Sequence, residues 1–174
     1  MEQAQDDLYR EAGEHFAPAI ARLARAMERD ADKARDLEQD IHCELWRSFA
    51  RFDRRCSLKT WIYRVAHNVA ADHVAAAANR PRPVPLEEIE ALPAAADAER
   101  LAAESHAIAR VRELIRRLSP LDAQAIVLWL EGQSGAEIAE ITGLGVNAAN
   151  VRIHRVKALL ANAFAEPAKG GATS

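Results

Sequence analysis

Three prolines at alternating positions divide this chain into two parts. They lie in the run Asn79–Pro85, and no helix can pass through that run because proline lacks a backbone donor and clashes with the preceding turn. The acidic, alanine-rich stretch that follows is typical of a flexible linker. The sequence therefore predicts two small domains, residues 1–78 and 99–165, joined by a linker over 79–98 and followed by a frayed tail over 166–174.

Both parts carry apolar residues at helical spacing, and neither shows a strand pattern. In the first part the stripes predict three helices, over about residues 6–29, 32–49 and 57–78. In the second part a helix begins near Glu99, and Ser119 with Pro120 stops it and starts the next one as cap and first helical residue. Alanine, leucine, arginine and glutamate dominate while aromatic residues make up only 5%, which also favours helices. We predict an all-α fold of two small helical domains.

The segment Ser134–Lys157 has the pattern of a helix-turn-helix. Ser134 and Glu137 have the spacing of a capping box at the start of its first helix. Gly143 is expected to close that helix, and Gly145 is expected to keep the turn tight.

The second helix of this motif has two contrasting faces. Its apolar stripe is expected to be Val146, Ala149, Ile153, Val156 and Leu160. Its polar face carries Asn147, Asn150, Arg152, Arg155 and Lys157 and no acid. A short helix that presents donors and no acids is suited to the major groove of DNA. A helical hairpin that merely packs is the alternative interpretation.

The formal net charge of −3 conceals a strong pattern along the chain. Residues 46–82 carry eight bases and two acids, a net charge of +6, whereas residues 1–45 carry a net charge of −6. A local basic patch attracts phosphates whatever the distant acids do. An ordinary solvated surface is the alternative, although two acids cannot neutralise this block.

Other classes of function find little support in the sequence. There is no apolar run of membrane-spanning length and no secretory signal. Cys43 and Cys56 are expected to be buried or partly buried thiols, and the six histidines show no metal-ligand spacing. No nucleophile–base pair or phosphate loop is evident. We expect a cytoplasmic protein that is not an enzyme and that binds no metal or cofactor.

Four stretches match the patterns of a known family. Leu118–Gly132 resembles "LPPxxRxVxxLxxxEG", and the helix-turn-helix ends at Val151–Arg155, close to "KSRLHRAR". Asp36–Trp46 resembles "DLVQEVFLRAW", and Phe52–His73 resembles "FRGESSFRTWLYRIARNLALDHL". The chain is thus similar, over about residues 9–73 and 114–160, to sigma factors of the extracytoplasmic-function (group 4) branch of the sigma-70 family.

The resemblance implies a sigma factor that directs core RNA polymerase to promoters. Residues expected to dock on the clamp helices of the largest polymerase subunit are Asp36, Gln39 and Asp40, although from the residues alone these acids could equally form a solvated helix face. Residues expected to recognise and help open the −10 element are Arg54, Arg55, Lys59, Tyr63, Arg64 and Asn68. Residues expected to bind the −35 element are Asn147, Ala148, Asn150, Val151, Arg152, Arg155 and Lys157. The implied partners are core polymerase, through its clamp helices and flap, promoter DNA, and an anti-sigma factor.

A module that opens DNA needs basic groups and surfaces that hold unstacked bases. Tyr63 lies off the apolar stripe and is expected to be exposed, whereas the stripe places Trp61 in the core. Trp46 and Trp129 are also assigned to core packing.

The chain departs from the family at two places. Lys33 and Arg35 stand where the family's "DAED" has acids, which predicts weaker docking and a need for an activating partner or modification. Asn147–Asn150 replaces "GTVK", so Asn150 stands in place of a lysine. An asparagine cannot neutralise a phosphate but can pair with adenine, which predicts weaker and more sequence-dependent binding to DNA.

Two other functions stay open from the sequence. The chain could be a stand-alone helix-turn-helix regulator, or a degenerate sigma-like protein that sequesters an anti-sigma partner. The sequence also leaves the relative placement of the two domains open. If they packed against each other, we would expect both DNA surfaces to be hidden.

Overall fold

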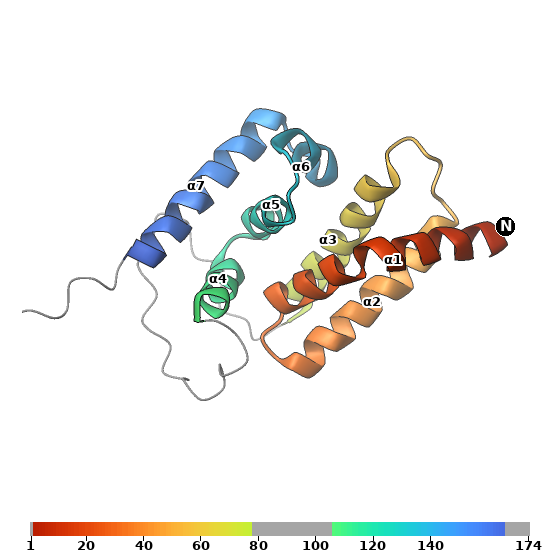
Figure 1. Ribbon diagram of the computed structural model, residues 1–174, viewed down its shortest axis with the longest axis horizontal. Coiled ribbons are helices and arrows are strands. Elements are labelled where there is room, and N and C mark those ends of the chain that lie inside the picture. Colours follow the sequence, from red (N-terminus) through yellow and green to blue (C-terminus); the bar gives the residue numbers. More distant parts are fainter. Residues whose placement is uncertain (1, 78–105, 166–174) are drawn as a thin grey trace, which may run out of the picture.

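The computed structural model describes residues 2–77 and 106–165 and forms seven helices over those ranges (Figure 1). The helices are α1 (Glu2–Met27), α2 (Ala31–Phe49), α3 (Leu58–Ala76), α4 (His106–Arg117), α5 (Pro120–Leu130), α6 (Gly135–Thr142) and α7 (Val146–Ala165). The all-α prediction is confirmed. The expected linker, the helix start near Glu99 and the tail lie outside the described residues.

The helix starts follow the local signals in the sequence. Asp30 caps α2 by accepting the backbone N–H groups of Asp32 and Lys33, each at 3.0 Å. Ser57 caps α3 and Ser119 caps α5, both as expected from the sequence. These caps satisfy backbone donors that a helix leaves without partners at its first turn.

The first helix of the helix-turn-helix is held at both ends as predicted. The backbone N–H of Ser134 donates to Glu137 Oε2 at 2.8 Å, and that of Glu137 donates to Ser134 Oγ at 3.2 Å. Gly143 adopts a φ of 77°, the left-handed conformation that glycine tolerates at a helix end. Gly145 is not among the glycines with positive φ, so the turn does not depend on its conformational freedom.

The N-terminal helices α1–α3 enclose a core of large aliphatic side chains. Leu37, Ile41 and Leu45 line the inner face of α2 and are fully buried. They pack with Ile20 and Leu23 of α1 in one cluster. Burying an aliphatic side chain of this size contributes about 1.5–3 kcal/mol, so this cluster accounts for much of the stability of the three helices.

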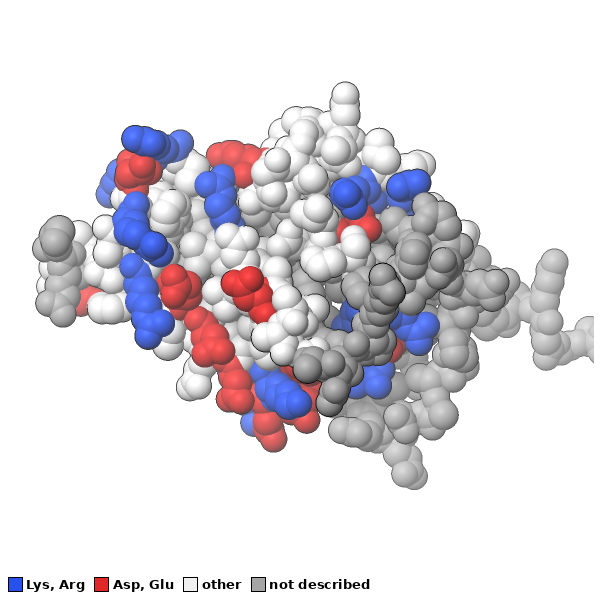
Figure 2. All heavy atoms as spheres, turned by 180° about the vertical axis from the view of Figure 1, so that it is seen from behind, with Lys and Arg blue, Asp and Glu red and all other residues white. Residues whose placement is uncertain are grey.

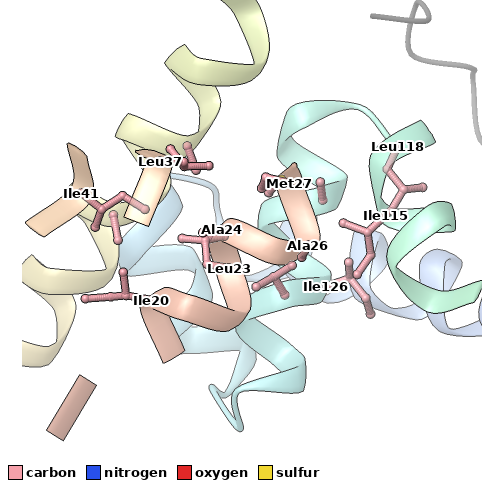
Figure 3. Packing of buried hydrophobic residues seen from close by; sticks show 14 of the residues in the cluster. Ile20, Leu23, Ala24, Ala26, Met27, Leu37, Ile41, Ile115, Leu118 and Ile126 are labelled. Atoms are coloured by element: carbon pink, nitrogen blue, oxygen red, sulfur yellow. The ribbon is translucent and has the colours of Figure 1, made fainter. Parts of the chain in front are cut away.

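The same hydrophobic cluster continues into the C-terminal helices. Ile115 and Leu118, from α4 and the turn after it, and Ile126 of α5 belong to it together with Met27 of α1. In Figure 3, Ala26 and Met27 lie between the α1–α2 side of the cluster and these C-terminal residues. The two halves of the chain therefore share a core, and α4 contacts α1 while α6 contacts α3.

Two tryptophans predicted in the core are exposed at the surface. Trp46 is 37% exposed and donates its indole N–H to Asp6 Oδ1 at 2.9 Å. Trp129 is 36% exposed and lies beneath the Lys157 ammonium, with 4.5 Å between Nζ and the ring centroid. Both predictions are wrong, because an indole at the edge of an apolar stripe can reach a polar partner at the surface.

Trp61 does pack against the core and donates its indole N–H to Ser48 Oγ at 3.0 Å, as expected for a stripe residue. Cys43 is exposed rather than buried, and Cys56 is partly buried. Over the described ranges, no helix combines the length and apolar character needed to cross a lipid bilayer.

Candidate nucleic-acid interface

Helices α6 and α7 form the predicted helix-turn-helix around a small apolar contact. Ile138 and Ala139 of α6 pack in one cluster with Ala149 and Ile153 of α7. Ala139 and Ala149 are 6% and 0% exposed, so small side chains let the two helices approach closely. Val146 was expected on this buried stripe, but it begins α7 and is 48% exposed.

The outer face of α7 presents most of the residues predicted to bind the −35 element. Asn147, Ala148, Asn150, Val151, Arg155 and Lys157 are all exposed. Val151 alone is 55% exposed, an apolar side chain available to contact a base methyl group. Because α7 contains no acid at all, nothing on the helix itself repels DNA.

Arg152 lies in a different environment from its neighbours on α7. Its guanidinium pairs with Asp122 Oδ1 of α5 at 2.7 Å, and the Asp122 side chain is only 9% exposed. The Ser119 hydroxyl donates to the other carboxylate oxygen of Asp122 at 2.6 Å. Arg152, predicted on the polar face, is thus engaged by a neighbouring helix, and its contact with the −35 element stays a prediction. The ion pair joins α7 to the capped start of α5.

Asn150 lies against the start of α6. A methyl group placed on Gly135 would come within 1.9 Å of Asn150 Oδ1, so the carboxamide takes its present position because residue 135 has no side chain. Lys157 is held over Trp129 of α5. The outer face of α7 is thus braced from the neighbouring helices at several points.

The residues predicted for the −10 element are only partly accessible. Arg54 and Arg55, in the loop before α3, and Asn68 are exposed. Arg55 pairs with Asp53 at 3.0 Å. Arg54 adopts a φ of 62°, which is strained for a residue with a side chain. The family pattern FRGESS has glycine at this position, where left-handed backbone costs nothing.

The other three −10 candidates contact the C-terminal helices. Lys59 forms an ion pair with Glu137 of α6. One Arg64 nitrogen donates to the backbone oxygen of Glu140 at 2.8 Å. Tyr63 is 8% exposed, so its predicted exposure is wrong, and burial raises the pKa of its hydroxyl. The hydrogen bond from Lys59 is the main reason that the pKa of Glu137 falls to about 2.

His67 lies one helical turn beyond Tyr63 and was not predicted from the sequence. It is 2% exposed, and Gln124 of α5 donates its amide to the backbone oxygen of His67 at 3.3 Å. Burial lowers the pKa of the imidazole to about 3, so the ring is neutral. The family pattern has an arginine at this position, and that departure is the signal in the sequence that could have drawn attention to it.

The predicted docking residues lie on the solvent side of α2. Asp36, Gln39 and Asp40 are all exposed. Figure 2, seen from behind, shows acidic groups in a diagonal row over the N-terminal helices and basic groups beyond it at the left edge. Lys33 and Arg35 are exposed at the start of α2, and Arg35 pairs with Asp32 at 3.0 Å.

Comparisons with known proteins agree with this arrangement. The family model of Sigma-70 region 2 matches residues 14–80, and that of Sigma-70, region 4 matches residues 108–160. "ECF RNA polymerase sigma factor SigC" of Mycobacterium tuberculosis (strain CDC 1551 / Oshkosh) is 32% identical over 136 residues, which cover 77% of this chain and 72% of the relative. SigM of Mycobacterium tuberculosis (strain ATCC 25618 / H37Rv), also named an ECF RNA polymerase sigma factor, is 29% identical over 142 residues, covering 82% of this chain and 69% of the relative.

A solved structure of CnrH in complex with the cytosolic domain of CnrY shares the fold. It superposes with a TM-score of 0.68 at 22% sequence identity and covers 95% of this chain and 98% of its own. The two matched regions correspond to the helices that carry the two candidate DNA surfaces. The chain therefore belongs to the extracytoplasmic-function branch of the sigma-70 family and is an RNA polymerase sigma factor.

Proposed function

We propose that this sigma factor divides promoter recognition between two domains, residues 1–78 and 99–165. Helix α7 binds the −35 element as duplex DNA, and α3 with the loop before it binds and helps to open the −10 element. The observation that carries the proposal is the exposed, acid-free face of α7, held by a capped helix-turn-helix. The protein acts as a non-catalytic subunit in the cytoplasm, where its polymerase works.

At the −35 element, charge and base contacts have separate roles. Arg155 and Lys157 are exposed cations suited to phosphates, which supply affinity without sequence information. Asn150 presents a carboxamide that can bond to both the N6 and the N7 groups of adenine. Replacing a lysine by this asparagine exchanges non-specific attraction for base discrimination.

At the −10 element, Arg54, Arg55 and Arg64 supply charge along the backbone of a displaced strand. Tyr63 offers a ring on which an unpaired base can stack, once that ring becomes accessible. Asn68 is exposed on the same helix and can bond to a base edge. Strand opening therefore draws on residues from both the loop and α3.

For polymerase docking we propose the exposed row Asp36, Gln39 and Asp40 on α2, aimed at the clamp helices of the largest subunit. Lys33 and Arg35 place positive charge one turn earlier on the same helix. If the polymerase surface is basic, Lys33 and Arg35 weaken docking because like charges repel. The double substitution Lys33→Asp with Arg35→Glu is then expected to raise the affinity for core polymerase, and an unchanged affinity would exclude this role.

We also propose that a second protein controls this sigma factor, as a protein of the anti-sigma type. CnrH, which shares the fold, was solved in complex with a cytosolic domain of another protein. Co-purification of the chain from its own cells, followed by reconstitution from separately purified components, tests this proposal. A chain that recovers only core polymerase would count against it.

Run-off transcription with purified core polymerase on a library of promoter fragments tests the proposed function. Transcripts that depend on the protein and share −35 and −10 patterns are expected. The matched pair Asn150→Ala and Asn162→Ala makes the assay specific, because both remove an exposed asparagine from α7 but only the first lies on the proposed DNA face. Equal behaviour of the two variants on every promoter would remove Asn150 from the base-reading set.

A further inference from the structure

We propose that Gly135, which lies outside the recognition helix, determines the specificity of this sigma factor at one base pair of the −35 element. It does so through Asn150, because the absence of a side chain at position 135 lets the Asn150 carboxamide lie against α6. This inference rests on the proposed function for the contact between Asn150 and a base. The positioning itself rests on the geometry of α6 and α7 in the free protein.

The backbone at position 135 does not require glycine. Gly135 is the first residue of α6, and it is not among the glycines with positive φ. Alanine is compatible with that conformation and is the better helix former. Ser134 and Glu137 form the capping box that starts the helix, so the cap does not depend on position 135 either. What glycine provides at this position is space.

The space beside Gly135 is occupied by the side chain of Asn150. A β-carbon added at position 135 would lie 1.9 Å from Oδ1, 2.9 Å from Cγ and 3.3 Å from Nδ2 of Asn150, which are its three nearest neighbours from other parts of the chain. Nonbonded heavy atoms attract best at about 3.5–4.0 Å and repel strongly at the first two of these distances. A side chain at position 135 must therefore displace the carboxamide.

The displacement changes the direction in which Asn150 points. Ala139 of α6 and Ala149 of α7 are buried in one cluster with Ile153, so the two helix backbones are held close together at the residue next to Asn150. Turning the amide about its own bond leaves Cγ in place, and Cγ itself would be too close to the added carbon. The side chain must therefore move to another of its staggered χ1 positions.

The direction of this side chain matters because its surface is open to DNA. Asn150 is exposed beside Asn147 and Val151, so the expectation that packing of the domains hides both DNA surfaces is wrong for α7. A carboxamide pairs with a base edge only when its oxygen and nitrogen both face that edge. Turning it away alters the reading of one base pair, whereas phosphate contacts by Arg155 and Lys157 carry no sequence information and stay as they are.

NMR of the side-chain amides tests the contact in the free full-length protein. The amide signals of Asn150 are identified by their loss in Asn150→Ala. Gly135→Ala is expected to shift these signals while the urea midpoint stays equal or rises, since alanine restricts the unfolded chain. Gly145→Ala is the matched control. It makes the same substitution in the same motif, at a glycine without positive φ where an added β-carbon meets nothing within 4 Å. It should leave the Asn150 signals in place.

Competition binding of the holoenzyme tests the role in specificity. The probe is a promoter fragment that supports run-off transcription, with its −35 base pairs changed one at a time. Gly135→Ala is expected to change the preference several-fold at the base pair where Asn150→Ala acts, and at no other. In a chain that already carries Asn150→Ala, the substitution at position 135 should add nothing, because the side chain through which it acts is gone.

Each outcome has a separate meaning. Unchanged Asn150 amide signals in Gly135→Ala overturn the contact. Shifted signals with an unchanged base preference overturn the role of Gly135 in specificity, as does an effect of Gly135→Ala that persists without the Asn150 side chain. Failure of the native chain to support transcription from any fragment overturns the proposed function instead, and the NMR measurement still decides whether the contact exists.

Discussion

The two candidate DNA surfaces differ in what the rest of the protein does to them. Helix α7 is supported from behind: Arg152 pairs with Asp122, and Lys157 rests on Trp129. Helix α3 is engaged from in front: Lys59, Tyr63 and Arg64 face α6. A surface that reads intact duplex benefits from a rigid, preformed shape. A surface that holds unpaired bases is useful only after the DNA opens, so it can be covered until then.

The largest effect is expected at the support behind α7. Asp122→Ala leaves the Arg152 guanidinium without its partner between two helices and removes the acceptor of the Ser119 hydroxyl. Leaving such a group unpaired is expected to lower the free energy of unfolding by about 2–3 kcal/mol. Urea unfolding measures the change.

The control for this prediction is a variant at the other candidate DNA surface. Glu137→Gln breaks a link of the same type on the exposed α3–α6 contact and should cost far less stability. If the two variants unfold alike, the two surfaces do not differ in the way proposed. Asp122→Asn, which keeps the shape and accepting oxygen, should recover part of the loss.

The second prediction asks whether the face of α7 reads bases. Asn150→Ala is expected to cost about 1–3 kcal/mol of binding on a preferred −35 sequence and little on unrelated duplexes. Competition binding across a set of duplexes separates these cases. A uniform loss on all sequences would mean that Asn150 contacts only the backbone.

The third prediction concerns the loss of stability at low pH that the buried His67 of α3 should cause. Burial holds the pKa of His67 near 3 in the folded protein, against 6.5 ordinarily, so the unfolded chain binds a proton that the folded one excludes. The stability is complete above about pH 6.5 and is lost as the pH falls toward 3. Between about pH 7.5 and pH 5.5 this single group is expected to remove about 1 kcal/mol of unfolding free energy.

His67→Gln is the control for the acid effect. The variant lacks the titrating ring, so its urea midpoint should depend less on pH over the same interval than that of the native chain. Tyr63 and Glu131 line the same cavity as His67. The negative charge of Glu131 is paired with Arg22. An identical pH dependence in the two proteins would rule out His67 as its source.

The smallest effect is expected at Arg54, in the loop before α3. Arg54→Gly relieves the left-handed backbone and is expected to raise the unfolding free energy by about 1 kcal/mol, since glycine adopts that conformation without strain. The same change removes a cation from the −10 surface and should weaken single-strand binding. Arg55→Gly, at the next position, should weaken binding without adding stability. A stabilised variant with unchanged strand binding would show that the strain serves another purpose.

Local signals in the sequence predicted the helices well. Ser57, Ser119 and the Ser134–Glu137 pair each satisfy backbone donors within four residues, so their effect is readable from neighbours in the chain. The helix-turn-helix followed from such local signals too, whereas the docking residues on α2 followed only from the family resemblance. These features need no knowledge of how distant segments meet.

Features that depend on distant segments were not predictable in this way. Lys59 and Glu137 are 78 positions apart, and Arg22 and Glu131 are 109 apart. Periodicity marked Arg152 as polar and outward, yet its partner Asp122 lies on another helix, 30 positions away. Helical spacing assigns a side chain to a face, and only the packing decides whether that face meets solvent or a neighbouring helix.

The close approach of Gly135 and Asn150 has a consequence for redesigning this sigma factor toward new promoters. The residue at position 150 and the space at position 135 form one unit, because even a methyl group at 135 would displace the Asn150 carboxamide. A library that varies the recognition helix alone keeps glycine at position 135, and with it the space against which the Asn150 carboxamide now lies. Pairing substitutions at both positions would let larger or differently directed side chains be presented to the DNA, so selection for altered specificity should sample the two positions together.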